Sequence, residues 1–138
     1  MRSLIHNDTN DQNLLLDDHD NIVGVIDFDD IGWAYPIVEL AVTVTYVSLV
    51  SEVDSIIAKL RLACQGFLSA RDLTEIEKSL LYDTCLMRFV QSISSRCFFH
   101  QLVDPDNEYL MQHSYTSWRT LEFLLALGEK EFISQVFQ

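Results

Sequence analysis

The chain has 138 residues, of which 49% are hydrophobic, and a formal net charge of −12. That length and hydrophobic fraction suit a single domain over residues 1–138. With 9 Lys+Arg against 21 Asp+Glu, the chain lacks the basic surface that nucleic acids and anionic membranes require, so neither partner is predicted. Three cysteines without a CxxC pair, and no leader-like or membrane-spanning segment, predict reduced thiols in a cytoplasmic protein.

The first part of the chain predicts a polar loop followed by a β-hairpin. The loop is "HNDTNDQN", residues 6–13. Apolar segments at 14–16 and 22–28 are separated by turn-forming residues at 17–21, which is the pattern of a hairpin. The turn lacks the glycine and distal glutamate of an EF-hand, so we expect a solvated tip and no calcium. Because an isolated hairpin is only marginally stable in water, it should pack on the helices.

From Pro36 onward the pattern is helical. Proline suits the first position of a helix, and residues 36–50 are apolar nearly all round, which predicts a buried helix. A second helix is expected over residues 52–68, ending near Gly66. The expected division is therefore a loop and hairpin at 1–35 and a helical subdomain at 36–138.

The strongest helix signal begins at a capping box formed by Thr74 and Glu77. It extends as one helix to the break at residues 104–107. Apolar residues repeat along it at helical spacing, namely Leu86, Phe89, Val90, Ile93 and Cys97.

A further helix is predicted over residues 108–127, with Gly128 as its stop and a last short helix after it. Its apolar side is expected to carry Leu110, Trp118, Leu121 and Leu125. The predicted fold class is mainly α with one small β-hairpin.

Asp8, Asn13 and Asp27 are the residues that carry chemistry. With His6, the first two form the pattern H-x-D-x-x-x-x-N, and Asp27 ends an apolar strand fourteen residues after Asn13. Phosphoryl transfer requires a carboxylate at the attacking hydroxyl, and a carboxylate and an amide oxygen that hold Mg²⁺ against the phosphates. A loop followed by a hairpin brings these groups together. A plain Asx-rich turn is the alternative for the loop taken alone.

The stretch "LIHNDTNDQNLLLDDHDNIVGVIDFDDIGWAYPIVELA" resembles the loop, hairpin and IDFG segment of the aminoglycoside phosphotransferase and choline kinase superfamily. The later stretches "QGFLSARDLTEIEKSLLY", "MRFVQS" and "NEYLMQHSYTSWRTLEFLLALG" are similar to the C-terminal half of the hydroxylysine kinase family. The resemblance implies a protein-kinase-like fold and a phosphotransferase with an alcohol acceptor. It further implies 5-hydroxy-L-lysine as acceptor, GTP or ATP as donor, and Mg²⁺.

The resemblance also implies roles for individual residues. Asp8 would be the catalytic base, and Asn13 and Asp27 would bind the metal. His6 is expected to brace the loop by hydrogen bonding. Asp30 would either face the ammonium groups of the acceptor or bond to local backbone.

Further residues have two interpretations each. Tyr35, with Trp33, would line the substrate pocket or pack in the core. Arg88 would bind a substrate carboxylate or pair with an acidic side chain. Glu39, near a helix N-terminus, is interpreted as a partner of the helix dipole. Asn10 and Asp11 are expected to be incidental.

The chain departs from the family pattern in two ways. Asn7 and Asp29 stand where the pattern has glycine, and asparagine is among the better substitutes for glycine in a left-handed conformation. The family also places a nucleotide-binding lobe before the loop, whereas only five residues precede His6 here. We therefore expect a C-terminal lobe that is weak or inactive alone and exposes an apolar surface suited to association. A non-catalytic lobe that binds an amine or a partner, and a kinase for choline, an aminoglycoside or homoserine, are the alternative functions.

Overall fold

A computed structural model describes residues 2–49, 55–108 and 114–138. The short strands are β1 (Ser3–Ile5), β2 (Leu14–Leu16), β3 (Ile22–Val25) and β4 (Gly32–Ala34), with a 3₁₀ helix at Asp11–Asn13. The helices are α1 (Pro36–Leu49), α2 (Ile56–Ala70), α3 (Glu75–Ser79), α4 (Leu81–Leu102), α5 (Ser114–Leu127) and α6 (Glu129–Val136). The mainly α fold with small antiparallel β pairs confirms the predicted fold class. None of the helices in the described ranges is both long and apolar enough to cross a membrane.

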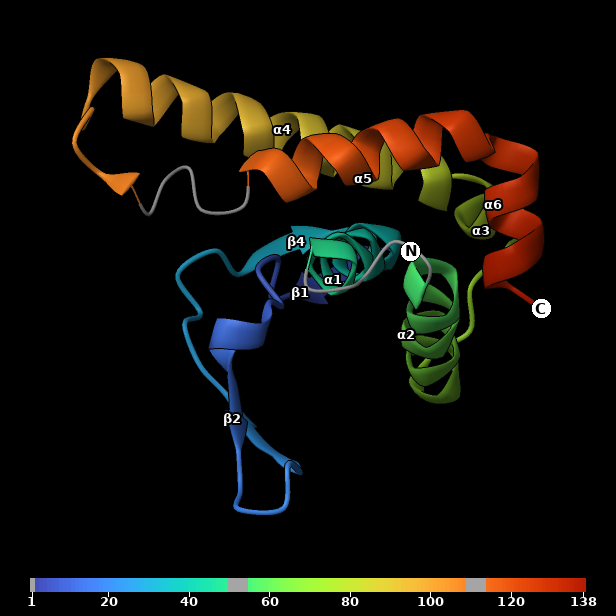
Figure 1. The fold of residues 1–138 in the computed structure, drawn as a ribbon. Helices are drawn as coiled ribbons and strands as arrows, with labels where there is room; N and C mark the ends of the chain where they lie inside the picture. The colour runs from blue at the N-terminus through green and yellow to red at the C-terminus, as the bar shows by residue number, and fades with distance from the viewer. Residues whose placement is uncertain (1, 50–54, 109–113) are drawn as a thin grey trace.

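The strands form two separate antiparallel pairs. β1 pairs with β4, with Leu4 opposite Trp33, so the start of the chain is tied to the strand that leads into α1. β2 pairs with β3, with Leu14 opposite Val25 and an irregularity between Leu15 and Leu16. The second pair is the predicted hairpin, and it points away from the helices (Figure 1).

The Asp17 carboxylate closes the hairpin turn. Its Oδ1 accepts hydrogen bonds from the backbone N–H groups of His19 and Asn21, both at 2.9 Å. The bonds from the side chain and backbone of Asn21, and then that from His19, lower the pKa of Asp17. Residues 17–21 are all exposed, which confirms the predicted solvated tip.

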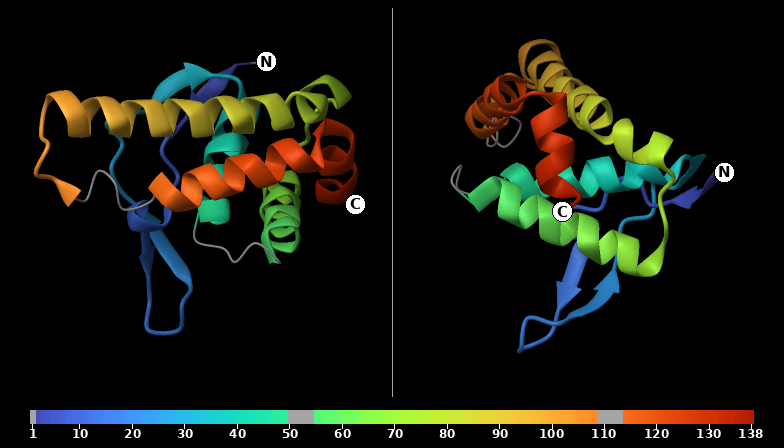
Figure 2. Two further views of the ribbon diagram at one scale, coloured as in Figure 1. Left: turned by 45° about the horizontal axis from the view of Figure 1, so that its top comes forward. Right: turned by 90° about the vertical axis from the view of Figure 1, so that its right-hand side faces the viewer.

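The expectation that the hairpin packs on the helices is wrong. Val23 is 65% exposed and Ile22 62% exposed, and the views of Figure 2 show the hairpin standing clear of the helices. At its base, the Ile26 N–H donates to the Asn13 carbonyl at 3.0 Å. The hairpin is held by its own ladder and by this junction with the loop.

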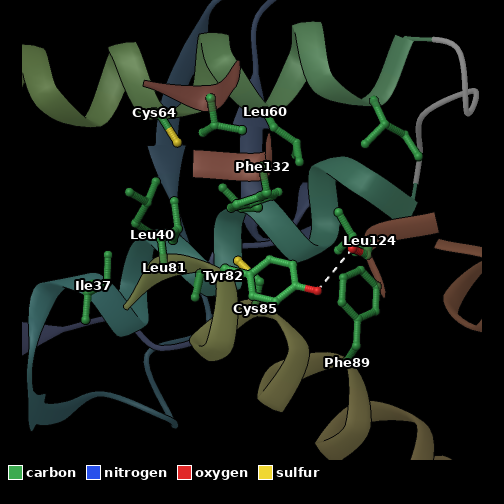
Figure 3. Packing of buried hydrophobic residues seen from close by; sticks show 14 of the residues in the cluster. Ile37, Leu40, Leu60, Cys64, Leu81, Tyr82, Cys85, Phe89, Leu124 and Phe132 are labelled. Carbon is green, nitrogen blue, oxygen red and sulfur yellow. Dashed lines mark hydrogen bonds between the residues drawn. The ribbon is translucent and has the colours of Figure 1, made fainter. Parts of the chain in front are cut away.

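α1 occupies the centre of the hydrophobic core, as its nearly continuous apolar sequence predicts. Leu40 and Val44 are fully buried, and α1 lies against both α2 and α4 (Figures 1 and 3). Its buried hydroxyls donate to carbonyls one turn earlier, Thr45 to Ala41 and Ser48 to Val44, so they enter the core without losing hydrogen bonds.

α6 covers the part of the core formed by α2, α4 and α5. Phe132 is fully buried, and its ring centre lies 5.5 Å from that of Tyr82. The Tyr82 hydroxyl donates to the Leu124 carbonyl at 3.1 Å, so the core keeps this polar group satisfied (Figure 3). Arg61 Nε donates to the Gln135 carbonyl at 2.8 Å, which ties α2 to α6.

The three cysteines are free, as predicted. Cys64 and Cys85 are buried in the core, and Cys97 is partly buried. Burial raises the pKa of Cys64 to about 12 and raises that of Cys85 well above the usual range. Both core thiols are therefore protonated and unreactive near neutral pH.

Two predicted helix boundaries are wrong. α2 continues through Gly66 to Ala70, because Gly66 does not adopt the positive φ of a glycine C-cap. The chain leaves the helix at Arg71, which is extended. The start predicted at residue 52 falls outside the described ranges.

The capping box at Thr74 is confirmed, but it begins only the short α3. Leu80 lies between α3 and α4, and its N–H bonds to residues both three and four positions earlier, which divides the predicted single helix.

The predicted apolar side of α5 is also wrong. Leu121 is buried, but Trp118 and Leu125 are more than half exposed, and Leu110 lies outside the described residues. The buried positions of α5 are Ser114, Ser117, Thr120, Leu121 and Leu124. Small side chains dominate this set, so the buried side of α5 is mostly small and polar, and the large aromatic faces solvent. Val90 of α4 is likewise exposed. Gly128, with φ +78°, ends α5 as predicted.

Candidate active site

Contacts with α1 hold the polar loop at residues 6–13. The backbone N–H of Asn7 donates to the Glu39 carboxylate at 2.8 Å, and the hydroxyls of Thr9 and Thr43 lie 2.8 Å apart. Asn7 has φ +69°, the left-handed conformation anticipated from the glycine of the family pattern. Glu39 therefore anchors the loop directly, a role beyond that of a dipole partner.

The Asp8 carboxylate accepts hydrogen bonds from four side chains. Its Oδ1 accepts from the Tyr46 hydroxyl at 3.2 Å and from Arg88 Nη2 at 3.3 Å. Its Oδ2 accepts from Asn10 Nδ2 at 2.9 Å and from Asn13 Nδ2 at 3.0 Å. The side chains of Asp8 and Arg88 are 22% and 19% exposed, so their ion pair is mostly shielded from water.

Tyr46 and Arg88 approach Asp8 from two different helices. Burial, and then the negative charge of Asp8, raise the pKa of Tyr46, so its hydroxyl stays protonated and donates. The guanidinium carbon of Arg88 lies 5.9 Å from the centre of the Tyr46 ring. These contacts fix the carboxylate between α1 and α4.

The two asparagines build the other side of the loop. Asn10 Oδ1 accepts the backbone N–H groups of Gln12 and Asn13 at 2.8 and 3.1 Å, which caps the 3₁₀ helix. Asn13 is buried, and its Nδ2 also donates to the Asp8 carbonyl at 2.8 Å. The expectation that Asn10 is incidental is wrong, because it both caps this turn and bonds to Asp8. Asp11 is exposed.

His6 connects the loop to the hairpin. Its Nδ1 accepts the Asp8 N–H at 3.4 Å, so Nε2 carries the proton and donates to the Ile26 carbonyl at 2.9 Å. Ile26 in turn donates to the Asn13 carbonyl. The His6 ring also lies 4.9 Å from that of Phe28, centre to centre. Asp27, which follows Ile26, is thereby fixed next to the loop.

The two predicted metal-binding residues, Asn13 and Asp27, lie at the junction of the loop and the hairpin. Asp27 has φ +62°, an unfavourable conformation for a residue other than glycine, and it is exposed. Because the Asn13 amide nitrogen is committed to Asp8, its amide oxygen is the atom left for a cation. No group of three His, Cys, Asp or Glu residues in the described ranges forms a protein cage for a metal. Mg²⁺ commonly needs only one or two protein oxygens, together with phosphates and water.

The remaining predicted residues lie apart from this network. Asp30 is exposed, and within the described residues no hydrogen bond joins it to Asp8. Tyr35 is 50% exposed, and Arg2 lies over its ring at 5.4 Å. Trp33 is 70% exposed. Core packing is thus excluded for both aromatics. Arg88 is the one residue of the predicted substrate set that contacts Asp8, through the acidic pairing given as one of its two interpretations.

The sequence reasoning missed the face of α1 that carries the loop. Glu39, Thr43 and Tyr46 follow the i, i+4, i+7 spacing of one helix face, and each contacts the loop. This polar stripe within an otherwise apolar helix is the sequence pattern that could have predicted the contact between α1 and the loop.

Comparison with known proteins identifies the family to which this sequence belongs. A sequence model of the phosphotransferase enzyme family matches residues 1–73. Hydroxylysine kinase of Bos taurus is 31% identical over 133 residues, covering 91% of this chain and 35% of that protein. The hydroxylysine kinases of Xenopus laevis and Danio rerio are 32% and 34% identical, each over 96% of this chain and over 37% and 38% of those proteins.

The chain therefore spans little more than a third of the length of these curated relatives. The search of solved structures found no match. The family match covers more than half of the chain and includes the whole loop, hairpin and α1, where Asp8, Asn13 and Asp27 lie. The chain belongs to the phosphotransferase enzyme family.

Proposed function

We propose that this chain carries the catalytic loop and acceptor-side helices of a small-molecule kinase. The kinase would transfer the terminal phosphoryl group of GTP or ATP to the hydroxyl of 5-hydroxy-L-lysine. The relatives named hydroxylysine kinase support this acceptor. The observation that carries the proposal is the Asp8 carboxylate, held between α1 and α4 on one side and Asn10 and Asn13 on the other.

In this proposal Asp8 orients the acceptor hydroxyl and takes its proton as the oxygen attacks phosphorus. A carboxylate has about four lone-pair positions, and four side-chain donors already approach Asp8. The hydroxyl must therefore replace one donor. The bond from Arg88 is the longest of the four at 3.3 Å, so it is the one we expect to open.

Asn13 and Asp27 would hold Mg²⁺, which neutralises charge on the phosphates when bound. His6 keeps these two groups together, through its bond to the Ile26 carbonyl beside Asp27. Phosphoryl transfer also requires groups that cradle the donor phosphates. The given sequence has four glycines and no glycine-rich phosphate loop, so we expect slow turnover by this chain alone.

The test is product formation by the 138-residue chain with 5-hydroxy-L-lysine, Mg²⁺ and GTP or ATP, followed by ³¹P NMR. Asp8→Asn should lower the rate at least about 100-fold, because it removes the proton acceptor while keeping the shape. Asp11→Asn changes an exposed carboxylate three residues away and should leave the rate unchanged. Equal rates for the two variants would refute a catalytic role for Asp8.

A second function is favoured by the Arg88–Asp8 ion pair, which neutralises the carboxylate that would act as base. On this alternative, the lobe binds an amine or a partner without turning it over. Saturable binding of 5-hydroxy-L-lysine by calorimetry, with no phosphorylated product at high protein concentration, would support it. Choline, an aminoglycoside and homoserine complete the acceptor panel, since the loop pattern does not distinguish among them.

A further inference from the structure

A polar pocket of about 200 Å³ lies beside Arg88 on the surface of α4. Five of its lining residues follow one helix face at the spacing i, i+3, i+4, i+7 and i+8, and Tyr46 of α1 completes it. The α4 residues are Arg88, Gln91, Ser92, Ser95 and Arg96. Arg88 and Tyr46 both bond to Asp8 Oδ1, so the pocket adjoins the proposed catalytic carboxylate.

The pocket is cationic in a strongly acidic chain. Among the residues that the structure describes, its lining includes two arginines and no aspartate or glutamate, although the chain has 21 acidic residues and only 9 basic ones. Within the described ranges, Arg88 pairs with Asp8 and Arg96 has no ion-pair partner. A cationic pocket without its own carboxylate is suited to an anionic ligand.

Buried guanidinium nitrogens strengthen this reading. Arg88 Nε and Arg96 Nη1 are both buried, and neither has a hydrogen-bond partner among residues 2–49, 55–108 and 114–138. A buried donor left unsatisfied is costly, and a bound ion or water is the usual explanation. Both nitrogens belong to residues that line this one pocket.

We infer that this pocket binds the carboxylate of an amino-acid acceptor through Arg88 and Arg96, with Ser92 and Ser95 beside them. The inference rests on the proposed function and narrows its acceptor to amino acids that carry a hydroxyl. Choline and aminoglycosides have no carboxylate and would leave both arginines unsatisfied. Transfer of Arg88 from Asp8 to the acceptor carboxylate would also free the lone pair that the hydroxyl needs.

A nucleotide phosphate is also anionic, but its proposed place is elsewhere. The proposed metal side, with Asn13 and Asp27, lies at the junction of loop and hairpin, where Asn13 bonds to Asp8 Oδ2. The pocket adjoins the groups that bond to Oδ1, on α1 and α4. In this arrangement the donor phosphates lie on the Oδ2 side of Asp8, and the acceptor carboxylate lies on the Oδ1 side.

The experiment compares 5-hydroxy-L-lysine with its carboxamide and with inorganic phosphate, by calorimetry on the 138-residue chain. The acid should bind at least about tenfold more tightly than the amide, since charge-assisted bonds contribute more than neutral ones. Arg96→Gln should weaken acid binding about 10- to 100-fold and leave amide binding unchanged. Lys59→Gln, which removes one positive charge from an exposed site on α2, is the matched control and should change neither.

Circular dichroism and the unfolding midpoint confirm that each variant folds, and Arg96→Lys, which keeps charge but loses the planar fork, should have intermediate affinity. Equal binding of acid and amide, stronger binding of phosphate than of the acid, or no binding of either amino compound would overturn the inference. Acid-selective binding without phosphorylated product would leave the inference standing and favour the non-catalytic binding lobe over the kinase proposal. Equal turnover of the acid and the amide would support the kinase proposal and overturn the inference that the pocket binds the carboxylate.

Discussion

At the scale of single residues, two positions of the candidate site have left-handed backbone. Asn7 precedes Asp8 with φ +69°, and Asp27 has φ +62°. Asn7 was predictable, because the family pattern has glycine there. The conformation of Asp27 was not, because it depends on how His6 and Asn13 hold the neighbouring Ile26. Two strained residues beside proposed catalytic and metal groups are consistent with a backbone shaped by function.

Asn7→Ala should lower the free energy of unfolding by about 1 kcal/mol, because alanine is disfavoured at positive φ. Asn7→Gly should be neutral or slightly stabilising, since glycine adopts this conformation freely. Urea denaturation measures both. Similar losses for the two variants would mean that the asparagine side chain, and not the backbone angle, is what stabilises the loop.

At the scale of elements, the capping box of α3 offers a test with a defined pH dependence. Thr74 Oγ1 accepts the Glu77 N–H, and Glu77 accepts the Thr74 N–H at 2.9 Å. Thr74→Ala should destabilise the protein by about 1 kcal/mol near neutral pH. Thr84→Ala, which removes a hydroxyl bonded to the Leu80 carbonyl inside α4, is the control and should cost less.

The effect should diminish in acid. The bonds from Thr74 lower the pKa of Glu77, so the carboxylate stabilises the folded state above its unfolded pKa of about 4.3. That contribution is lost as the pH falls through the folded pKa. Urea unfolding at pH 7 and at pH 3 should show a smaller Thr74→Ala effect at the lower pH. A constant difference would exclude Glu77 from the cap.

The elements also show where prediction from sequence works and where it fails. Local signals specified the start of α1 at Pro36, the hairpin turn, the capping box and Gly128. Which face of a helix is buried depends on partners far along the chain, so it was less predictable. Trp118 of α5 is more than half exposed while the neighbouring Ser117 and Thr120 are buried, an arrangement that hydrophobicity alone does not reveal. For the same reason Asp8 and Asn13 were found, and Tyr46 and Arg96 were not.

At the scale of the whole molecule, one end exposes a large amount of apolar side chain. The exposed residues of the hairpin and its exit are Leu15, Leu16, Ile22, Val23, Val25, Ile26 and Phe28. Clustered exposure of this kind favours association, and strand edges add unpaired backbone groups. We therefore expect the purified chain to self-associate as its concentration rises.

The double substitution Ile22→Thr and Val23→Thr should reduce that association in sedimentation velocity, because it keeps β-branched residues while adding hydroxyls. Stability should change by less than about 0.5 kcal/mol, since both side chains are mainly exposed. Leu62→Gln replaces a similarly exposed residue on α2 and should leave association unchanged. An equal effect from that variant would indicate nonspecific stickiness.

The Asp8–Arg88 contact joins residues 80 positions apart in the chain. Closing so long a loop is entropically costly, whereas the helices form from near neighbours. The helical core should therefore assemble first, and the polar loop at residues 6–13 should dock last. If the loop docks last, it should also be the first part to open, so it can detach while α1 stays folded. Hydrogen exchange should then be faster at the amides of Asn7 and Asp8 than in the middle of α1. The site would open and close as a local equilibrium of its own, independent of the unfolding of the protein that holds it.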